Sequence, residues 1–157
     1  KPVKIDSVAI EQSTGILGRT GPDKDSLYPF TIKVYLKDPI GANYYRIILF
    51  KNGERVTDDI ESTTQLFDDA ILTPNETLEM PLILKCKGKE IVKVELISFD
   101  KASYDYQMSL FTTITSAGGS FSVPDNPTTN FNYDVLGYFS AYSSDTASGI
   151  VPLPEKK

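Results

Sequence analysis

The feature that most constrains this chain is the alternation of apolar and polar residues along its middle part. In PFTIKVYLKD (residues 29–38) every second residue is a large apolar one, and this set is Phe30, Ile32, Val34 and Leu36. A period of two is that of a strand with one buried face. The next run, NYYRIILFKNGERV (residues 43–56), is apolar on both faces until Asn52-Gly53. That dipeptide predicts a two-residue hairpin turn, because both positions take positive φ.

Further strands are predicted on either side of this region. The stretch KIDSVAIEQ (residues 4–12) is expected to form the first strand, and a short extended piece is expected near residues 65–67. In LEMPLILKCKGKEIVKVELISF (residues 78–99), two strand-like runs flank Lys87-Gly88, which predicts a second hairpin. Pro81 cannot donate to a ladder, so its strand is expected at a sheet edge or beyond the proline.

Residues 101–116 are predicted to form a helix. Their polar and apolar residues also alternate over 103–110, as in a strand, but five side chains fall on one helical face: Tyr104, Gln107, Met108, Phe111 and Ile114. Asp100 is a good N-cap, and Gly118-Gly119 a good stop. The helix is therefore favoured over the strand.

The aromatic stretch VLGYFSAYS (residues 135–143) is predicted to be the last strand, closing the sheet system after an irregular loop. Its small residues, Gly137 and Ala141, indicate close approach to another element such as the helix. The fold class expected is an antiparallel β-sandwich, immunoglobulin- or transthyretin-like, with one helix. We expect one domain over 1–152 and a tail over 153–157, and removal of the chain from Ser148 onward is expected to matter little.

Composition excludes several classes of function. The 157 residues carry 16 basic and 21 acidic side chains, for a net charge of −5, and no apolar run is long enough to span a bilayer as a helix. Nucleic-acid binding needs clustered basic residues, and here they are scattered, so no nucleic-acid partner is expected. No signal peptide is visible at the N-terminus.

Residue types that carry chemistry are scarce. There is no histidine, the commonest general base and metal ligand, and the single cysteine, Cys86, alternates with apolar residues as a buried strand thiol would. No enzymatic activity, cofactor or resident metal is therefore expected. Two alternatives stay open. One is a hydrolase based on the carboxylate pairs Asp58-Asp59 or Asp68-Asp69. The other is a calcium site in GPDKDS, using Asp23 and Asp25.

Tyrosine is the most suggestive residue type, with nine copies and no tryptophan. Tyrosine is amphipathic and tolerates partial burial, so it serves both core edges and contact surfaces. The candidate binding residues are Tyr44, Tyr45, Arg46, Tyr138 and Tyr142.

Five stretches together carry a family resemblance. They are KPVKIDSV (1–8), KDPIGANYYRI (37–47), VELISFDKASYDYQMSL (94–110), VPDNPTTNFN (123–132) and VLGYFSAYS (135–143). In this order they resemble the second half of the family labelled domain of unknown function 4249, which comprises secreted or outer-membrane lipoproteins of Bacteroidota. The Asp-Pro-x-Gly-x-Asn-Tyr-Tyr-Arg and Leu-Gly-Tyr-Phe-x-Ala-Tyr patterns are the most specific.

The resemblance implies a place at the cell envelope, periplasmic or on the outer-membrane surface. Contact with a membrane is expected only through a lipid anchor that this chain lacks. A partner protein or a glycan is the expected ligand, and an accessory role beside a TonB-dependent transporter is implied; a structural or assembly subunit is the alternative. The resemblance also makes Asp-Ser/Thr-aliphatic triplets candidate O-glycosylation sites, with Ser26 and Thr146, in expected loops, ahead of Ser7.

Overall fold

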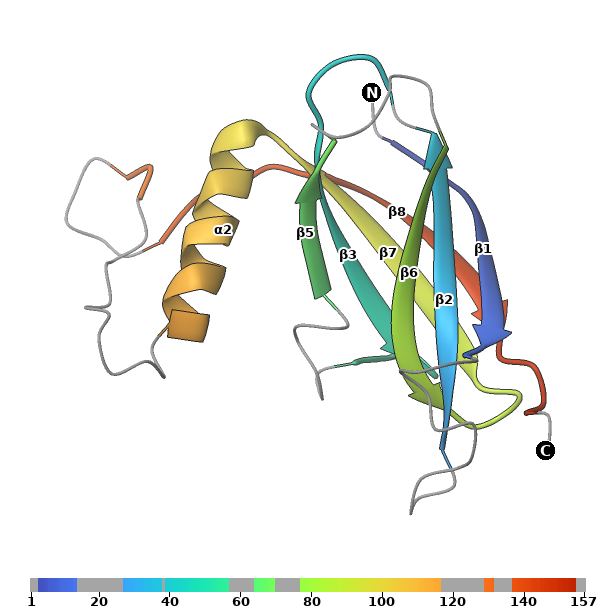
Figure 1. The fold of residues 1–157 in the computed structure, drawn as a ribbon. Helices are drawn as coiled ribbons and strands as arrows, with labels where there is room; N and C mark the ends of the chain where they lie inside the picture. Colours follow the sequence, from blue (N-terminus) through green and yellow to red (C-terminus); the bar gives the residue numbers. More distant parts are fainter. Residues whose placement is uncertain are drawn as a thin grey trace.

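The computed structural model describes residues 3–13, 27–37, 39–56, 64–69, 77–116, 129–131 and 137–154. Its elements are β1 (Ile5–Gln12), β2 (Tyr28–Lys37), β3 (Tyr44–Lys51), β4 (Glu54–Arg55), β5 (Thr64–Asp68), β6 (Thr77–Cys86), β7 (Ile91–Phe99), α2 (Lys101–Ser116) and β8 (Ser143–Ile150). Two antiparallel sheets face each other, and α2 lies outside them (Figure 1). The predicted fold class, a mainly antiparallel β-sandwich with one helix at 101–116, is confirmed.

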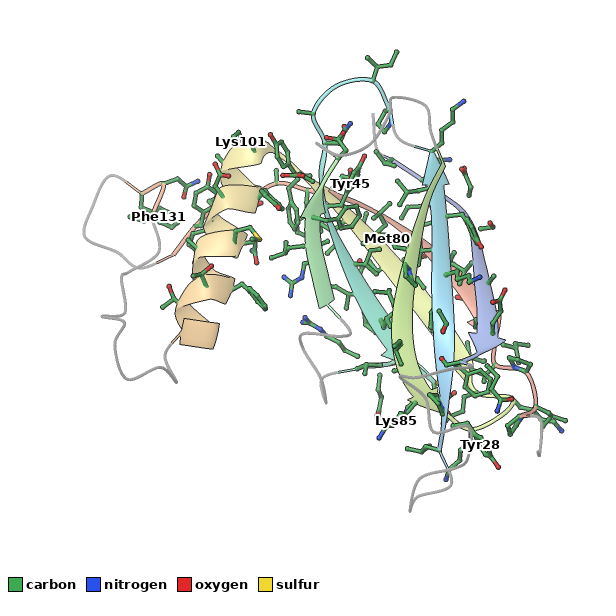
Figure 2. The ribbon with its side chains drawn as sticks, in the orientation of Figure 1. Tyr28, Tyr45, Met80, Lys85, Lys101 and Phe131 are labelled. Carbon is green, nitrogen blue, oxygen red and sulfur yellow. The ribbon has the colours of Figure 1, made fainter. Side chains whose placement is uncertain are left out.

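Sheet A has the order β1-β2-β6, and sheet B has the order β4-β3-β7-β8 with β5 also paired to β3. The alternating residues of β2 project between the sheets, where all four predicted apolar side chains are fully buried. Across from them lie the inward residues of β3 and β7, namely Tyr45, Ile47, Leu49, Val92, Val94 and Leu96. Figure 2 shows Tyr45 and Met80 projecting into this space. Pro81 lies in β6, an edge strand of sheet A, as predicted.

The hairpin at Asn52-Gly53 is confirmed. Lys51 pairs with Glu54, and the two turn residues have φ of 51° and 90°. Positive φ at both positions matches the right-handed twist of the flanking strands.

The predicted hairpin at Lys87-Gly88 is wrong. The chain does turn there, but β6 pairs with β2 in sheet A while β7 pairs with β3 and β8 in sheet B. The turn is therefore an arch that crosses from one sheet to the other, and Lys89 takes the positive φ of 69°. Each flanking strand has one fully apolar face, and the arch buries these two faces against each other instead of aligning them side by side.

The helix begins as predicted. The carboxylate of Asp100 accepts a hydrogen bond of 2.7 Å from the backbone N–H of Ser103, as an N-cap does. Gly118-Gly119, its expected stop, lies outside the described residues. No helix in the described ranges is long and apolar enough to cross a membrane.

The predicted last strand at 135–143 is wrong. Residues 137–142 form no strand, and β8 begins at Ser143, where the predicted strand was to end. A Cβ atom placed on Gly137 would lie 3.5 Å from the Phe131 ring, so the predicted packing of this glycine against the helix is also wrong. The expectation that the chain from Ser148 onward is dispensable fails too, because β8 runs to Ile150 and Val151 is only 1% exposed in the core.

The sequence of β8, SSDTASGI, is poor in sheet-forming residues because of its position. Strand β1 lies close to it at this side of the sandwich, where Asp145 accepts a hydrogen bond of 2.8 Å from the backbone N–H of Ile5. A Cβ atom on Gly149 would lie 2.8 Å from Cδ1 of Ile10. Small residues are therefore needed in β8, and close packing selects them over sheet propensity.

Candidate functional site

Helix α2 carries aromatic contacts on two opposite sides. Residues two apart on a helix point about 200° apart, so Tyr104 and Tyr106 face different neighbours. Tyr104 packs on Tyr44 of β3, with ring centroids 5.0 Å apart, and Tyr106 stacks on Tyr138 at 4.8 Å and 21° between planes. The helix thus joins sheet B to the segment 137–142.

Hydrogen bonds fix the same segment to the start of the helix. The hydroxyl of Ser140 lies 2.8 Å from the hydroxyl oxygen of Ser103, to which it donates, and Ser103 is buried. Ser103 in turn donates from its backbone and its side chain to Asp100. These two hydrogen bonds hold the pKa of the Asp100 carboxyl below its usual value of 3.8. This small network connects the helix cap to Ser140, which the sequence pattern had predicted to lie in a strand.

Asn130 clamps the next part of the chain. Its side-chain oxygen accepts from the backbone N–H of Phe139 at 2.9 Å, and its amide donates to the carbonyl of Phe139 at 2.7 Å. Both backbone groups of one residue are thereby satisfied by one asparagine. We call residues 129–131 and 137–142 the aromatic loop.

The aromatic loop presents large apolar side chains to solvent. Tyr138 packs on the helix, whereas the side chain of Phe139 faces outward and is 75% exposed. Phe131 is 45% exposed, and Figure 2 places it beyond the helix, away from the sandwich. Tyr142 is also exposed and packs edge-on against Phe99 with centroids 6.4 Å apart.

The five predicted binding residues are not brought together as one surface. Tyr45 is fully buried and packs on Phe67 at 5.1 Å, so its prediction as a binding residue is wrong. Tyr44 and Arg46 lie half-buried between sheet B and α2, whereas Tyr138 and Tyr142 belong to the aromatic loop. The alternation of β3 explains the split, because Tyr45 points into the core and its two neighbours point out.

Arg46 occupies an unusual position on the outer face of sheet B. Its Nη1 donates to Oε1 of Gln107 at 3.3 Å, while its buried Nε has no hydrogen-bond partner. Burial lowers the pKa of Arg46, and the positive charge of Arg55 lowers it further. The pKa of Tyr104 is raised, mainly by burial and further by the negative charges of Asp68 and Asp105.

Asp69, a candidate catalytic carboxylate, serves the loop 39–43 instead. It is buried, and its Oδ2 accepts from the backbone N–H of Asn43 at 2.8 Å and from the Asn43 amide at 2.6 Å. The same amide donates to the carbonyls of Pro39 and Gly41, which has a φ of 117°. The asparagine of the Asp-Pro-x-Gly-x-Asn pattern therefore organises this loop.

The predicted calcium, hydrolase and O-glycosylation residues are in part outside the described residues. Asp23, Asp25, Ser26, Asp58 and Asp59 lie outside the described residues. Thr146, expected in a loop, is an exposed residue of strand β8, and Ser7 is exposed on β1. Within the ranges that the structure describes, no group of three or more His, Cys, Asp or Glu side chains could hold a metal ion.

Cys86 is a buried thiol of β6, as predicted. Burial is the main cause that raises its pKa to about 11, and the nearby Glu90 adds to the shift. The thiol is therefore protonated at neutral pH, a state unsuited to nucleophilic attack.

Four residues of these contacts were not predicted from the sequence: Asn130, Phe131, Phe139 and Gln107. A signal for the first three was present in NFN followed by GYF, since asparagine beside glycine and aromatics is typical of built loops. Nothing in the sequence marks Gln107 as the neighbour of Arg46, because 61 residues separate them.

These features define a β-sandwich domain with an outer helix and a clamped aromatic loop. The chain belongs to the family described as Domain of unknown function (DUF4249), whose model matches residues 1–148. Searches of curated proteins and of solved structures find no match.

Proposed function

We propose that this chain is a non-enzymatic recognition module that binds a partner protein through the aromatic loop. The observation that carries the proposal is the state of Phe139, whose side chain is 75% exposed while Asn130 holds its backbone on both sides. An exposed aromatic ring on a fixed backbone loses little conformational entropy on binding. Aromatic anchors of this kind supply much of the energy of protein interfaces.

A protein partner fits the chemistry better than a glycan. The side chains of Phe131 and Phe139 hold no polar atom with which to bond sugar hydroxyls. Apolar anchors of this size suit a hydrophobic pocket on another protein, with Tyr142 adding a hydroxyl at its edge. Glycan binding through Tyr142 is the second outcome that the experiment below separates.

We place this module at the cell envelope as part of the same proposal. The support is the resemblance to secreted or outer-membrane lipoproteins, which also suggests an accessory role beside a TonB-dependent transporter. The envelope is therefore the compartment in which to seek the partner.

The test is co-purification of the full-length protein from its own envelope, followed by measurement of the partner's affinity for variants. Phe139→Ala should weaken binding by about 30-fold or more, since a central aromatic anchor contributes about 2 kcal/mol or more. Ile40→Ala is the matched control, because Ile40 is 81% exposed on a different loop. Equal affinity of the two variants would refute the proposal, and a soluble glycan that displaces the partner would favour the glycan.

A further inference from the structure

Two arginines, Arg46 and Arg55, share the outer face of sheet B. Arg55 pairs with Phe50 in the hairpin, and alternation puts Arg46, Ile48 and Phe50 on one face of β3. Paired residues share a face, so Arg55 lies on the face that carries Arg46. The two side chains flank Ile48, which is buried although it points away from the core.

Arg46 is half-buried on this face and Arg55 is exposed on it, and their charges interact. The charge of Arg55 contributes to the lowered pKa of Arg46, after burial. Like charges in a partly desolvated place repel each other, and this repulsion is relieved when an anion binds between them. A sheet and a helix that enclose a guanidinium would ordinarily supply a counter-charge.

Within the described part of the chain, most of the N–H donors of Arg46 have no acceptor. A guanidinium offers five N–H donors, and the bond recorded for Arg46 is that from Nη1 to the neutral Oε1 of Gln107, at 3.3 Å. Its Nε is buried without a partner. In the described part of the chain, neither Arg46 nor Arg55 forms an ion pair.

Gln107 of α2, which lies beside Arg46, adds another hydrogen-bond donor. The oxygen of Gln107 is turned toward Arg46, and its amide group remains to donate to a bound group. Glu95 stands opposite Ile48 on the same face of the sheet, and it forms no ion pair with either arginine. Apart from the carboxylate of Glu95, the groups named here are donors, and they match the oxygens of an anion.

We propose that Arg46 and Arg55, with Gln107 beside them, form a site for an oxyanion, a carboxylate or phosphate group. Arginine is suited to this task because its planar fork of donors bonds two oxygens at once. The site lies between β3, β4 and α2 and is separate from the aromatic loop. It is independent of the proposed protein partner, and failure of one proposal leaves the other standing.

The test follows the side-chain Nε–H signal of Arg46 in a ¹H–¹⁵N spectrum of the full chain during titration with inorganic phosphate, with acetate, and with chloride at matched ionic strength. A saturable shift with phosphate or acetate, and none with chloride, is the expected result. Comparison of the phosphate and acetate arms identifies which oxyanion the site prefers. Arg55→Gln should weaken binding by about tenfold, since a hydrogen-bonded charge contributes about 1.5 kcal/mol or more.

Two further variants keep the experiment decisive. Arg46→Lys retains the charge but removes the fork. Its binding is followed by the side-chain amide signal of Gln107, and it should be weakened about tenfold. Glu95→Gln should leave the affinity unchanged or raise it. A shift that grows linearly and equally with all three salts means an adventitious ion only and overturns the proposal. The proposal also fails if Arg55→Gln binds phosphate and acetate as tightly as the parent does.

Discussion

Val151→Ala should destabilise the protein even though it lies beyond the last strand. Val151 is 1% exposed, its N–H donates to the carbonyl of Glu90 at 2.9 Å, and its carbonyl accepts from Lys89 at 2.8 Å. The change removes two buried methyl groups, each contributing about 0.8 kcal/mol of transfer free energy. With the cavity that remains, the expected loss is about 2–3 kcal/mol in the free energy of unfolding.

Thermal and urea unfolding, followed by circular dichroism, measure this loss. For a chain of this size it corresponds to a fall in Tm of about 4–12 °C. Leu153→Ala is the matched control two residues further on, because Leu153 is 68% exposed. Its cost should stay within about 0.5 kcal/mol.

Two results would refute this reasoning. If Val151→Ala melts like the parent, the end of β8 does not reach the core. If Leu153→Ala costs as much as Val151→Ala, the chain beyond β8 packs differently from the way described.

Three further changes test other parts of the structure. Hydrogen bonds from Ser103 lower the pKa of Asp100 in the folded state, so the stabilisation by this carboxylate is present above its unfolded pKa and is lost as the pH falls through its folded pKa. Asp100→Ala should therefore lower the free energy of unfolding by about 0.5–2 kcal/mol at pH 7 and remove this part of the acid sensitivity. Urea unfolding at pH 7 and at a pH below the folded pKa measures both effects. Cys86, with a pKa of about 11, should resist iodoacetamide at pH 8 in the folded chain and react after denaturation; rapid reaction in the folded state would contradict its burial. Asn130→Ala should raise the hydrogen-exchange rate of the Phe139 amide by about tenfold or more, and an unchanged rate would mean that the clamp does not form.

The parts of the fold that could be predicted were those where local pattern and burial agree. Alternation marked the inward face of β2, Asn52-Gly53 marked a hairpin, and Asp100 marked the start of α2. The turn at Lys87-Gly88 was also visible, but a turn only reverses the chain. Whether the strands on either side pair or face each other depends on partners distant in sequence, here β2 and β3.

The last strand was misassigned because propensity pointed the wrong way. The aromatic residues of 137–142 favour sheets but lie in a loop. There Tyr138 stacks on Tyr106, and Asn130 forms hydrogen bonds with the backbone of Phe139. The residues of β8 are poor sheet formers selected by the nearness of Ile10 to Gly149. Similarly, the sequence marked tyrosines as contact residues but did not separate buried Tyr45 from exposed Tyr142.

Site-specific photo-crosslinking at Phe139 tests the central claim, recognition through the aromatic loop, most directly. A photoreactive phenylalanine analogue is placed at position 139, or at the control position Ile40, which is also highly exposed, in full-length protein in its own cells. We predict one defined crosslinked protein from position 139 that is absent from position 40 and reduced by Phe131→Ala. Identical products from both positions, or none from position 139, would contradict the account.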